Sequence, residues 1–305
     1  MILVTGGHGF LGRALVRELG DRPHVAPRSS ELDLLDGEAT RRYLQAHRIT
    51  QVIHAAGFVG GIGLHRAHPG RVAADNLLMG LNLLRAAALL PQPAQVVVVS
   101  TVCAYPEAAP IPTPETSLYD GYPSADTAAY GLAKRELHSL AAALAAEYGL
   151  AYSYVIPTNL YGPGDHFDEA RSHVVPALIR RAHEARQAGT ERLVVWGDGS
   201  ATRDLLYVDD CARGLVLALD TPAANGEVLN LGSGEEVSIR TLAETICARV
   251  GFAGKLEFDP GKPQGAPRRA LDPAKARRLL DFRLAVALDE GLGRTVDWYV
   301  QHKGH

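Results

Sequence analysis

The sequence predicts an α/β protein with a Rossmann-type doubly wound parallel sheet and a smaller C-terminal α/β domain. In the first half, short β-branched runs alternate with longer Ala- and Leu-rich segments of helical period, which is the rhythm of parallel βαβ units. A glycine-rich turn directly follows the first of these runs. The alternation ends near residue 160, where turn residues multiply. We therefore expect one domain over residues 1–160 and a second mainly over residues 161–305.

The expected elements follow from these runs in order. Strands are predicted at residues 2–5, 51–54, 96–100 and 153–156, and helices at 12–19, 76–90 and about 127–148. The second half predicts a helix at 174–188, a strand at 193–196 and a helix after Asp209, with the segment around 203–220 returning to the first domain. The Pro-, Gly- and Arg-rich stretch 259–269 predicts a binding loop or lid.

Composition excludes several classes of function. The 305 residues carry a formal net charge of −3 without a basic stripe or tail, so nucleic acid is not an expected partner. No segment reaches membrane-spanning length, and the apolar run from Ile2 enters a glycine turn at Gly6, so we expect neither a membrane span nor a signal-type leader. Three cysteines without a CxxC pair, Cys103, Cys211 and Cys247, argue against a disulfide framework and a metal site. These features favour a cytoplasmic protein.

Glycines at positions 6, 9 and 12 lie between the first predicted strand and helix. Gly6 allows a tight turn, Gly9 lets the backbone approach a pyrophosphate, and Gly12 lets the helix pack on the strand. The N-terminus of the helix then receives the anion. This pattern predicts a dinucleotide-binding site.

The end of the second strand distinguishes the two nicotinamide cofactors. A ribose-binding acid is expected within residues 24–30, and none is present. Arg28, with Ser29 or Ser30, favours a 2′-phosphate and therefore NADP(H), whereas the alternative is that Arg28 is a solvated loop residue. Asp33 and Leu34 are predicted to flank the adenine, and the small residues Ala55, Ala56 and Gly57 to let the backbone pass close to the cofactor.

A tyrosine and a lysine one helical turn apart predict an acid for carbonyl reduction. Tyr130 and Lys134 share one face of the predicted helix, and the positive charge is expected to lower the pKa of the phenol. Thr101 follows the strand at 96–100, and ligands of open α/β sheets bind at such carboxyl ends. Its hydroxyl is therefore expected to bond the same substrate oxygen. The alternative is an exposed aromatic residue beside a solvated lysine.

These motifs together resemble the extended short-chain dehydrogenase/reductases. The resemblance rests on the glycine turn, on Thr101 four residues before Tyr105-Pro106, and on Tyr130-x-x-x-Lys134. More narrowly, nearly the whole chain is similar to the GDP-L-fucose synthase family. The most specific matching segments are 59–62, 103–106, 157–163, 172–178, 195–197, Arg203 before Val208-Asp209-Asp210, and Lys262-Pro263 leading to Pro267-Arg268.

The resemblance implies NADPH-dependent 3,5-epimerisation and 4-reduction of a GDP-4-keto-6-deoxy sugar, forming GDP-L-fucose. Thr101, Tyr130 and Lys134 would serve the reduction, and Cys103 and His173 match the family's epimerising pair. A 4-keto sugar has acidic hydrogens at C3 and C5, so inversion needs a base and an acid on opposite faces. Cys103, two residues after Thr101, is expected to point into the same pocket by the period of a strand. The alternatives are a small buried thiol at 103 and a capping or surface histidine at 173.

The resemblance also implies the binding residues. Cofactor contacts are expected from Gly6, Gly9, Phe10, Leu11, Gly12, Arg28, Asp33, Leu34, Ala55, Ala56, Tyr130, Lys134, Pro157, Asn159, Leu160 and His173. Substrate contacts are expected from Asn159, Val174, Arg181, Trp196, Arg203 and Arg268. Arg181 lies two turns after His173, and with Arg203 it is predicted to clasp the diphosphate of the GDP-sugar.

Some observations leave the substrate open. Residues 123–129, His8 in the glycine turn and an extra residue within 56–58 depart from the family pattern beside the sugar and the cofactor. The alternatives are a related nucleotide-sugar 4-reductase or epimerase acting on a heptose or dideoxy sugar, and a non-enzymatic NADP-sensing protein. A 4,6-dehydratase needs an acid after the threonine, where Val102 and Cys103 stand. Helices 76–90 and 130–148 carry more Ala and Leu than one face needs, which together with the resemblance predicts a homodimer.

Overall fold

Six parallel strands form the main sheet of the computed structural model, which describes residues 1–169, 172–262 and 265–302. Their order is β2-β1-β3-β4-β5-β9, and every neighbouring pair is parallel. The order reverses at β1, whose carboxyl end is where such sheets bind ligands. The predicted Rossmann-type sheet is confirmed. The strands are β1 (Ile2–Thr5), β2 (His24–Val25), β3 (Gln51–His54), β4 (Gln95–Val99), β5 (Tyr152–Pro157) and β9 (Val228–Leu231).

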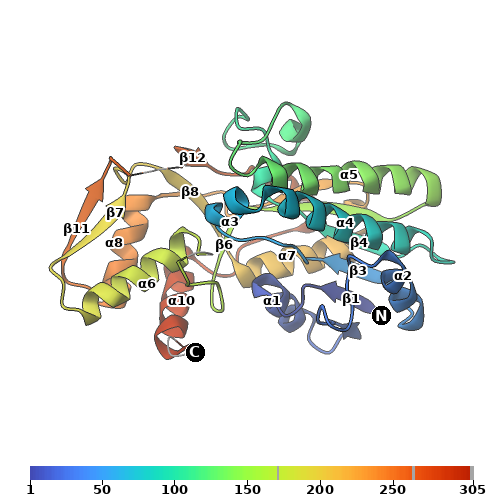
Figure 1. The fold of residues 1–305 in the computed structure, drawn as a ribbon, viewed down its shortest axis with the longest axis horizontal. Helices are drawn as coiled ribbons and strands as arrows, with labels where there is room; N and C mark the ends of the chain where they lie inside the picture. The colour runs from blue at the N-terminus through green and yellow to red at the C-terminus, as the bar shows by residue number, and fades with distance from the viewer. Residues whose placement is uncertain (170–171, 263–264, 303–305) are drawn as a thin grey trace.

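Helices cover both faces of this sheet (Figure 1). One face carries α1 (Phe10–Leu19) and α7 (Val208–Asp220), and the other carries α2 (Gly37–Ala46), α4 (Pro69–Ala88) and α5 (Ala128–Tyr148). Alternate valines of β4 enter the two cores, Val97 and Val99 on the α7 side and Val96 and Val98 on the α5 side. Burial on both faces explains why β4 is a continuous apolar run.

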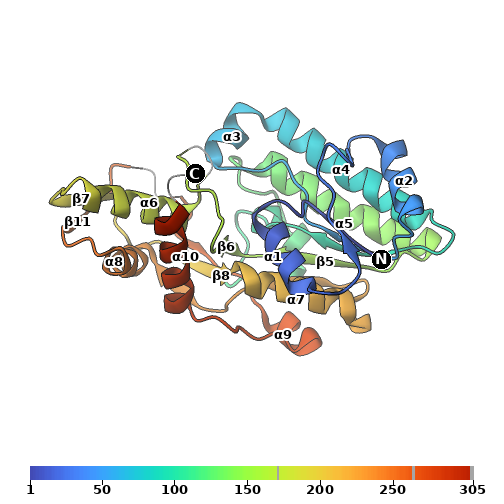
Figure 2. The same cartoon turned by 90° about the horizontal axis from the view of Figure 1, so that it is seen from below.

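Six short strands and three helices build the second region, beside the carboxyl edge of the sheet (Figure 2). β8 (Thr202–Tyr207) pairs with β6 (Asn159–Tyr161), β10 (Glu236–Ser238) and β12 (Arg268–Arg269), while β7 (Arg192–Trp196) pairs with β11 (Lys255–Asp259). A third apolar core joins these strands to α6 (Val174–Gln187), α8 (Ile239–Val250) and α10 (Leu288–His302). α7 and β9 return from this half of the sequence to the main sheet.

Several boundaries differ from the predicted ones. α4 begins at Pro69 rather than at residue 76, because proline is favoured in the first helical turn and the polar first turns hide the apolar period. The short helices α2 and α3 (Ile62–Ala67) and the strand β9 were not predicted. In the stretch 259–269, β11 ends at Asp259 and β12 begins at Arg268, while Pro263 and Gln264 lie outside the described residues. Among the residues that the structure describes, no helix has the length and apolarity to cross a bilayer.

Candidate active site

The turn between β1 and α1 has the shape that its glycines require. Gly6 has a φ of +71°, and a Cβ added there would lie 2.8 Å from the backbone nitrogen of Ala56. A Cβ at Gly12 would lie 1.9 Å from the carbonyl oxygen of Gly6, so only glycine lets α1 pack this closely. Gly9 caps α1 without a side-chain hydrogen bond, and a Cβ there would meet only the Gly6 oxygen, at 3.2 Å. The space in front of the helix N-terminus is therefore open.

Arg28 lies just after β2 and is exposed. Its backbone N–H donates to the Glu31 carboxylate at 2.7 Å, and its guanidinium has no partner among the described residues. His8, in the glycine turn, contacts the carbonyl of Ala26 through Nε2 at 3.0 Å and so joins the turn to this segment. The Asp33 carboxylate accepts from the N–H of Leu35 and remains exposed, whereas Leu34 is buried in the core.

Tyr130 and Lys134 lie on α5 and are both buried. The Lys134 ammonium donates to the carbonyls of Val99, at 3.0 Å, and Ala56, at 3.4 Å. A Cβ added at Gly57 would lie 3.9 Å from both the Tyr130 hydroxyl and Lys134 Nζ, so the two polar ends face the same small space.

The ionisation of this pair differs from the expectation. Burial raises the pKa of Tyr130, with a contribution from Cys103, instead of the lysine lowering it. Burial also lowers the pKa of Lys134 to about 8. Desolvation penalises both charged forms and outweighs the attraction that was predicted. The phenol therefore stays protonated, as a proton donor must.

Thr101 and Cys103 lie near Tyr130 and Lys134 in a turn, and not along a continuing strand as the strand period had predicted. β4 ends at Val99, and a 3₁₀ turn, η1 (Val102–Ala104), follows. The Thr101 hydroxyl accepts from the N–H of Cys103 at 3.2 Å. A Cβ added at Gly131 would lie 2.1 Å from the carbonyl oxygen of Cys103, so the absence of a side chain there lets η1 pack directly on α5 beside Tyr130.

His173 is the N-cap residue of α6, as its predicted position at a helix start requires. Removal from water, followed by the nearby imidazoles of His166 and His65, lowers its pKa. His65, on α3, in turn stacks obliquely near Tyr130, with 5.5 Å between ring centroids. The histidine side of the site thus adjoins the tyrosine side.

The residues expected to hold the sugar nucleotide are engaged with protein atoms on the second region. Arg181 donates to the carbonyl of Val194, and Arg203 to that of Thr202 at 2.6 Å. Arg268 forms a two-pronged ion pair with Glu236. Trp196 is 56% exposed at the end of β7.

Three more predicted contact residues line the junction between the two regions. Pro157 ends β5, and Asn159 begins β6, where its amide donates to the Asp204 carbonyl at 3.0 Å. Leu160 packs against the same core cluster as Phe10 and Leu11, next to the glycine turn. Val174 packs against the core under α6, half-buried.

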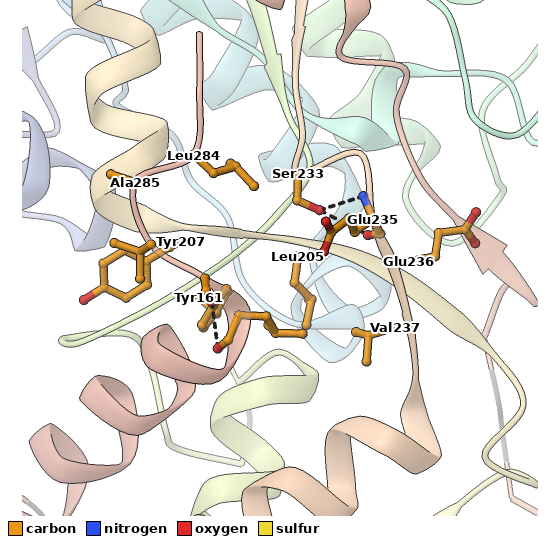
Figure 3. A pocket seen from close by; sticks show the side chains of 12 residues that line it. Tyr161, Leu205, Tyr207, Ser233, Glu235, Glu236, Val237, Leu284 and Ala285 are labelled. Atoms are coloured by element: carbon orange, nitrogen blue, oxygen red, sulfur yellow. Dashed lines mark hydrogen bonds between the residues drawn. The ribbon is translucent and has the colours of Figure 1, made fainter.

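A cavity of about 400 Å³ lies elsewhere, between β8, β10 and the 284–288 segment (Figure 3). Tyr161 points toward the Leu288 carbonyl, and the Ser233 hydroxyl accepts from the N–H of Glu235. None of the five predicted catalytic residues lines this cavity.

Sequence reasoning missed several residues that support the site. Asn76, in the apolar face of α4, accepts from the N–H of Phe58 and donates to its carbonyl, which fixes the loop that carries Ala56. His54 ends β3, where its Nδ1 meets the Thr5 hydroxyl at 2.8 Å, and burial followed by Lys134 lowers its pKa. A polar residue inside an apolar run was the available signal for both.

Comparisons with known proteins show the family of the chain. Residues 2–232 match the NAD dependent epimerase/dehydratase family. A probable GDP-L-fucose synthase from Oryza sativa subsp. japonica is 37% identical over 99% of this chain and 92% of its own length. The GDP-L-fucose synthase of Escherichia coli (strain K12) is 34% identical over 99% and 97%, respectively. The structure of a GDP-L-fucose synthetase from Naegleria fowleri bound to NADP superposes with a TM-score of 0.88 at 30% identity, over 99% of this chain and 94% of the other.

Proposed function

Because the chain belongs to the NAD dependent epimerase/dehydratase family, we propose that it epimerises C3 and C5 of a GDP-4-keto-6-deoxy sugar and reduces C4. The product is GDP-L-fucose, as the names of its relatives indicate. One observation carries the proposal beyond family membership. The close contact of Gly131 with the Cys103 carbonyl packs η1 on α5, and Cys103 contributes to the raised pKa of Tyr130, which supports a thiol and a phenol acting in one site.

NADP(H) is the cofactor of this enzyme, and the residues around the first turn fit it. The open space before α1 receives a pyrophosphate at backbone N–H groups, with Gly9 leaving room for it. The Arg28 guanidinium is exposed and has no partner among the residues that the structure describes, so it suits the 2′-phosphate that distinguishes NADP from NAD. When bound, NADPH supplies the hydride for C4.

In the reduction, side chains of α5 and of the segment around η1 bind and protonate the oxygen at C4. Tyr130 donates its proton to that oxygen as negative charge develops on it. Lys134, fixed by two backbone carbonyls, places an ammonium beside the phenol and stabilises the charge that remains. The Thr101 oxygen already accepts from the Cys103 N–H, so its own O–H is free to donate to the substrate.

In the epimerisation, Cys103 and His173 act on the carbon-bound hydrogens. The Cys103 thiolate removes the proton from C3 or C5, and the ketone at C4 delocalises the resulting charge. His173 returns a proton to the opposite face from its protonated form, which its lowered pKa makes more acidic but less populated at neutral pH. Each inversion therefore moves one proton from carbon to sulfur and one from nitrogen to carbon.

The second region holds the GDP part of the substrate. Arg181 and Arg203 each use N–H groups on a backbone carbonyl and retain others for the diphosphate. Trp196 offers an exposed ring to the base, while Asn159 and Val174 adjoin the sugar. Arg268 reaches the diphosphate only by loosening its pair with Glu236.

The surface of the helical face supports a homodimer. α4 and α5 pack side by side, and Leu78 on α4 remains exposed. Two copies of this pair would bury such residues in a four-helix contact. The three cysteines are free thiols, which suits the reducing cytoplasm.

The direct test supplies the purified protein with NADPH and GDP-4-keto-6-deoxy-D-mannose. Consumption of NADPH that requires this sugar, with an NMR spectrum of the product showing inversion at C3 and C5, is the expected result. Reduction without either inversion would refute the epimerase half. The absence of any sugar-dependent NADPH consumption would refute the proposed function as a whole.

A further inference from the structure

The side chain of His65 has an unsatisfied nitrogen beside the reducing centre. His65 is 6% exposed, and its buried Nδ1 has no hydrogen-bond partner among the residues that the structure describes. An unpaired buried polar atom costs stability and is uncommon in native proteins. Such an atom next to a site is typical of a group that finds its partner in a ligand.

Two predicted catalytic residues flank this imidazole. Its ring centroid lies 5.5 Å from that of Tyr130, with the planes inclined at 46°. It also lies close enough to His173 to affect the ionisation of that residue. His65 therefore lies beside the group proposed to protonate the C4 oxygen, and its charge is felt at the group proposed to return a proton to carbon.

The position of His65 depends on contacts that its neighbours make with two other segments. Arg66, the next residue, holds Asp126 through two hydrogen bonds of 3.0 and 3.2 Å, which ties α3 to the stretch 123–129 before Tyr130. On its other side, Asn76 fixes Phe58, within the stretch that carries the extra residue. These contacts therefore hold the segments on either side of His65 in place.

We propose that His65 hydrogen-bonds the hydroxyl on C3 of the keto sugar and thereby selects a 3-hydroxy substrate over a 3-deoxy one. This proposal rests on the proposed function. The carbons next to C4 carry different groups: C3 carries a hydroxyl, whereas C5 of a 6-deoxy sugar carries a methyl group and the ring oxygen. An unpaired ring nitrogen beside the C4 site can form a hydrogen bond with the hydroxyl on C3, whereas C5 carries no hydroxyl to pair with it.

The ionisation state of the ring suits a hydroxyl. Burial lowers the pKa of His65, although a hydrogen bond with the backbone of Gly60 partly opposes this, so the neutral ring is favoured at neutral pH. A neutral imidazole has one donor and one acceptor nitrogen, and a hydroxyl can meet either. A site that pairs a substrate hydroxyl rejects the analogue without it, because its own polar group is then left unpaired.

The test compares two ketones, GDP-4-keto-6-deoxy-D-mannose and its 3-deoxy analogue, by kcat/KM for NADPH consumption. The wild type is expected to prefer the 3-hydroxy sugar by about tenfold. His65→Leu should bring the ratio of the two values close to one, while His65→Gln, which keeps a polar group, should retain most of it. His68→Leu is the matched control, since His68 is exposed and caps α4 without a side-chain bond, and it should leave the ratio unchanged.

The ratio is independent of the fraction of protein that is folded, because both sugars report on the same preparation. A collapsed ratio in His65→Leu alone supports the proposal. An unchanged ratio, with both values lowered equally, would mean that His65 only packs against Tyr130 and would overturn it. If the wild type consumed NADPH with neither sugar, the proposed function would fall first, and this proposal with it.

Discussion

The reducing centre and the sugar-nucleotide side hold their polar groups in different ways. Tyr130 and Lys134 are buried, and Lys134 is fixed by two backbone carbonyls that no substrate needs to displace. Arg203 and Arg268 lie nearer the surface, and Arg268 is occupied by the Glu236 carboxylate. Under the proposed function, this difference means that the acid is preorganised, whereas the clamp rearranges when substrate binds. Preorganisation is most effective where charge develops in the transition state.

The largest effect is expected from removing the preorganised acid. Tyr130→Phe keeps the ring and its contact with His65 but removes the proton donor, so reduction should slow by about a hundredfold or more. The rate of NADPH consumption measures it. Tyr122→Phe is the control, because Tyr122 is exposed, and it should be unaffected. Equal rates for the wild type and Tyr130→Phe would assign the acid to another group.

The pH dependence of reduction tests the role of the lysine. Burial lowers the pKa of Lys134 to about 8, so the ammonium is present below that pH and is lost above it. We expect kcat/KM for reduction to fall about tenfold per pH unit above about pH 8. Lys134→Arg stays charged throughout this range, so its slower reaction should lack the falling limb. A fall in kcat/KM at the same pH in both proteins would show that the Lys134 ammonium is not the group that titrates.

Cofactor preference tests the other fixed site. Removing the guanidinium in Arg28→Ala should weaken binding of NADPH about tenfold and leave binding of NADH nearly unchanged, because charge-assisted contacts to phosphate are the strong ones. Fluorescence titration of the free enzyme with each nucleotide measures both affinities. A variant that retains the wild-type preference would show that Arg28 is a solvated loop residue.

The smallest effect concerns the adjustable clamp. Glu236→Gln removes the charge that holds Arg268, so the KM for the GDP-sugar should fall about two- to fivefold with kcat unchanged. Arg268→Ala should raise the KM instead. If Glu236→Gln raised the KM to the same extent as Arg268→Ala, the pair would act as one structural unit, and the clamp would not open as proposed.

The same contrast explains what could be predicted from the sequence. Tyr130 and Lys134 are four residues apart on one helix, so their shared face followed from helical period alone. The approach of Cys103 depended on Gly131 and a 3₁₀ turn, which a strand period could not anticipate. The pKa of Tyr130 was predicted in the wrong direction, because burial at that depth is a tertiary property. His65 and the Arg268–Glu236 pair likewise depend on contacts between distant segments.

The central claim is that one pocket holds two separable sets of acid–base groups. It is tested most directly by incubating enzyme, GDP-4-keto-6-deoxy-D-mannose and NADP⁺ in deuterated water and counting deuterium at C3 and C5. Tyr130→Phe should exchange both positions, whereas Cys103→Ser, with a far less acidic hydroxyl, should exchange neither and still reduce a keto group. His173→Gln should impair completed inversion more than the initial exchange. Exchange of both positions by Cys103→Ser at the wild-type rate would contradict the claim and leave Cys103 as a core thiol.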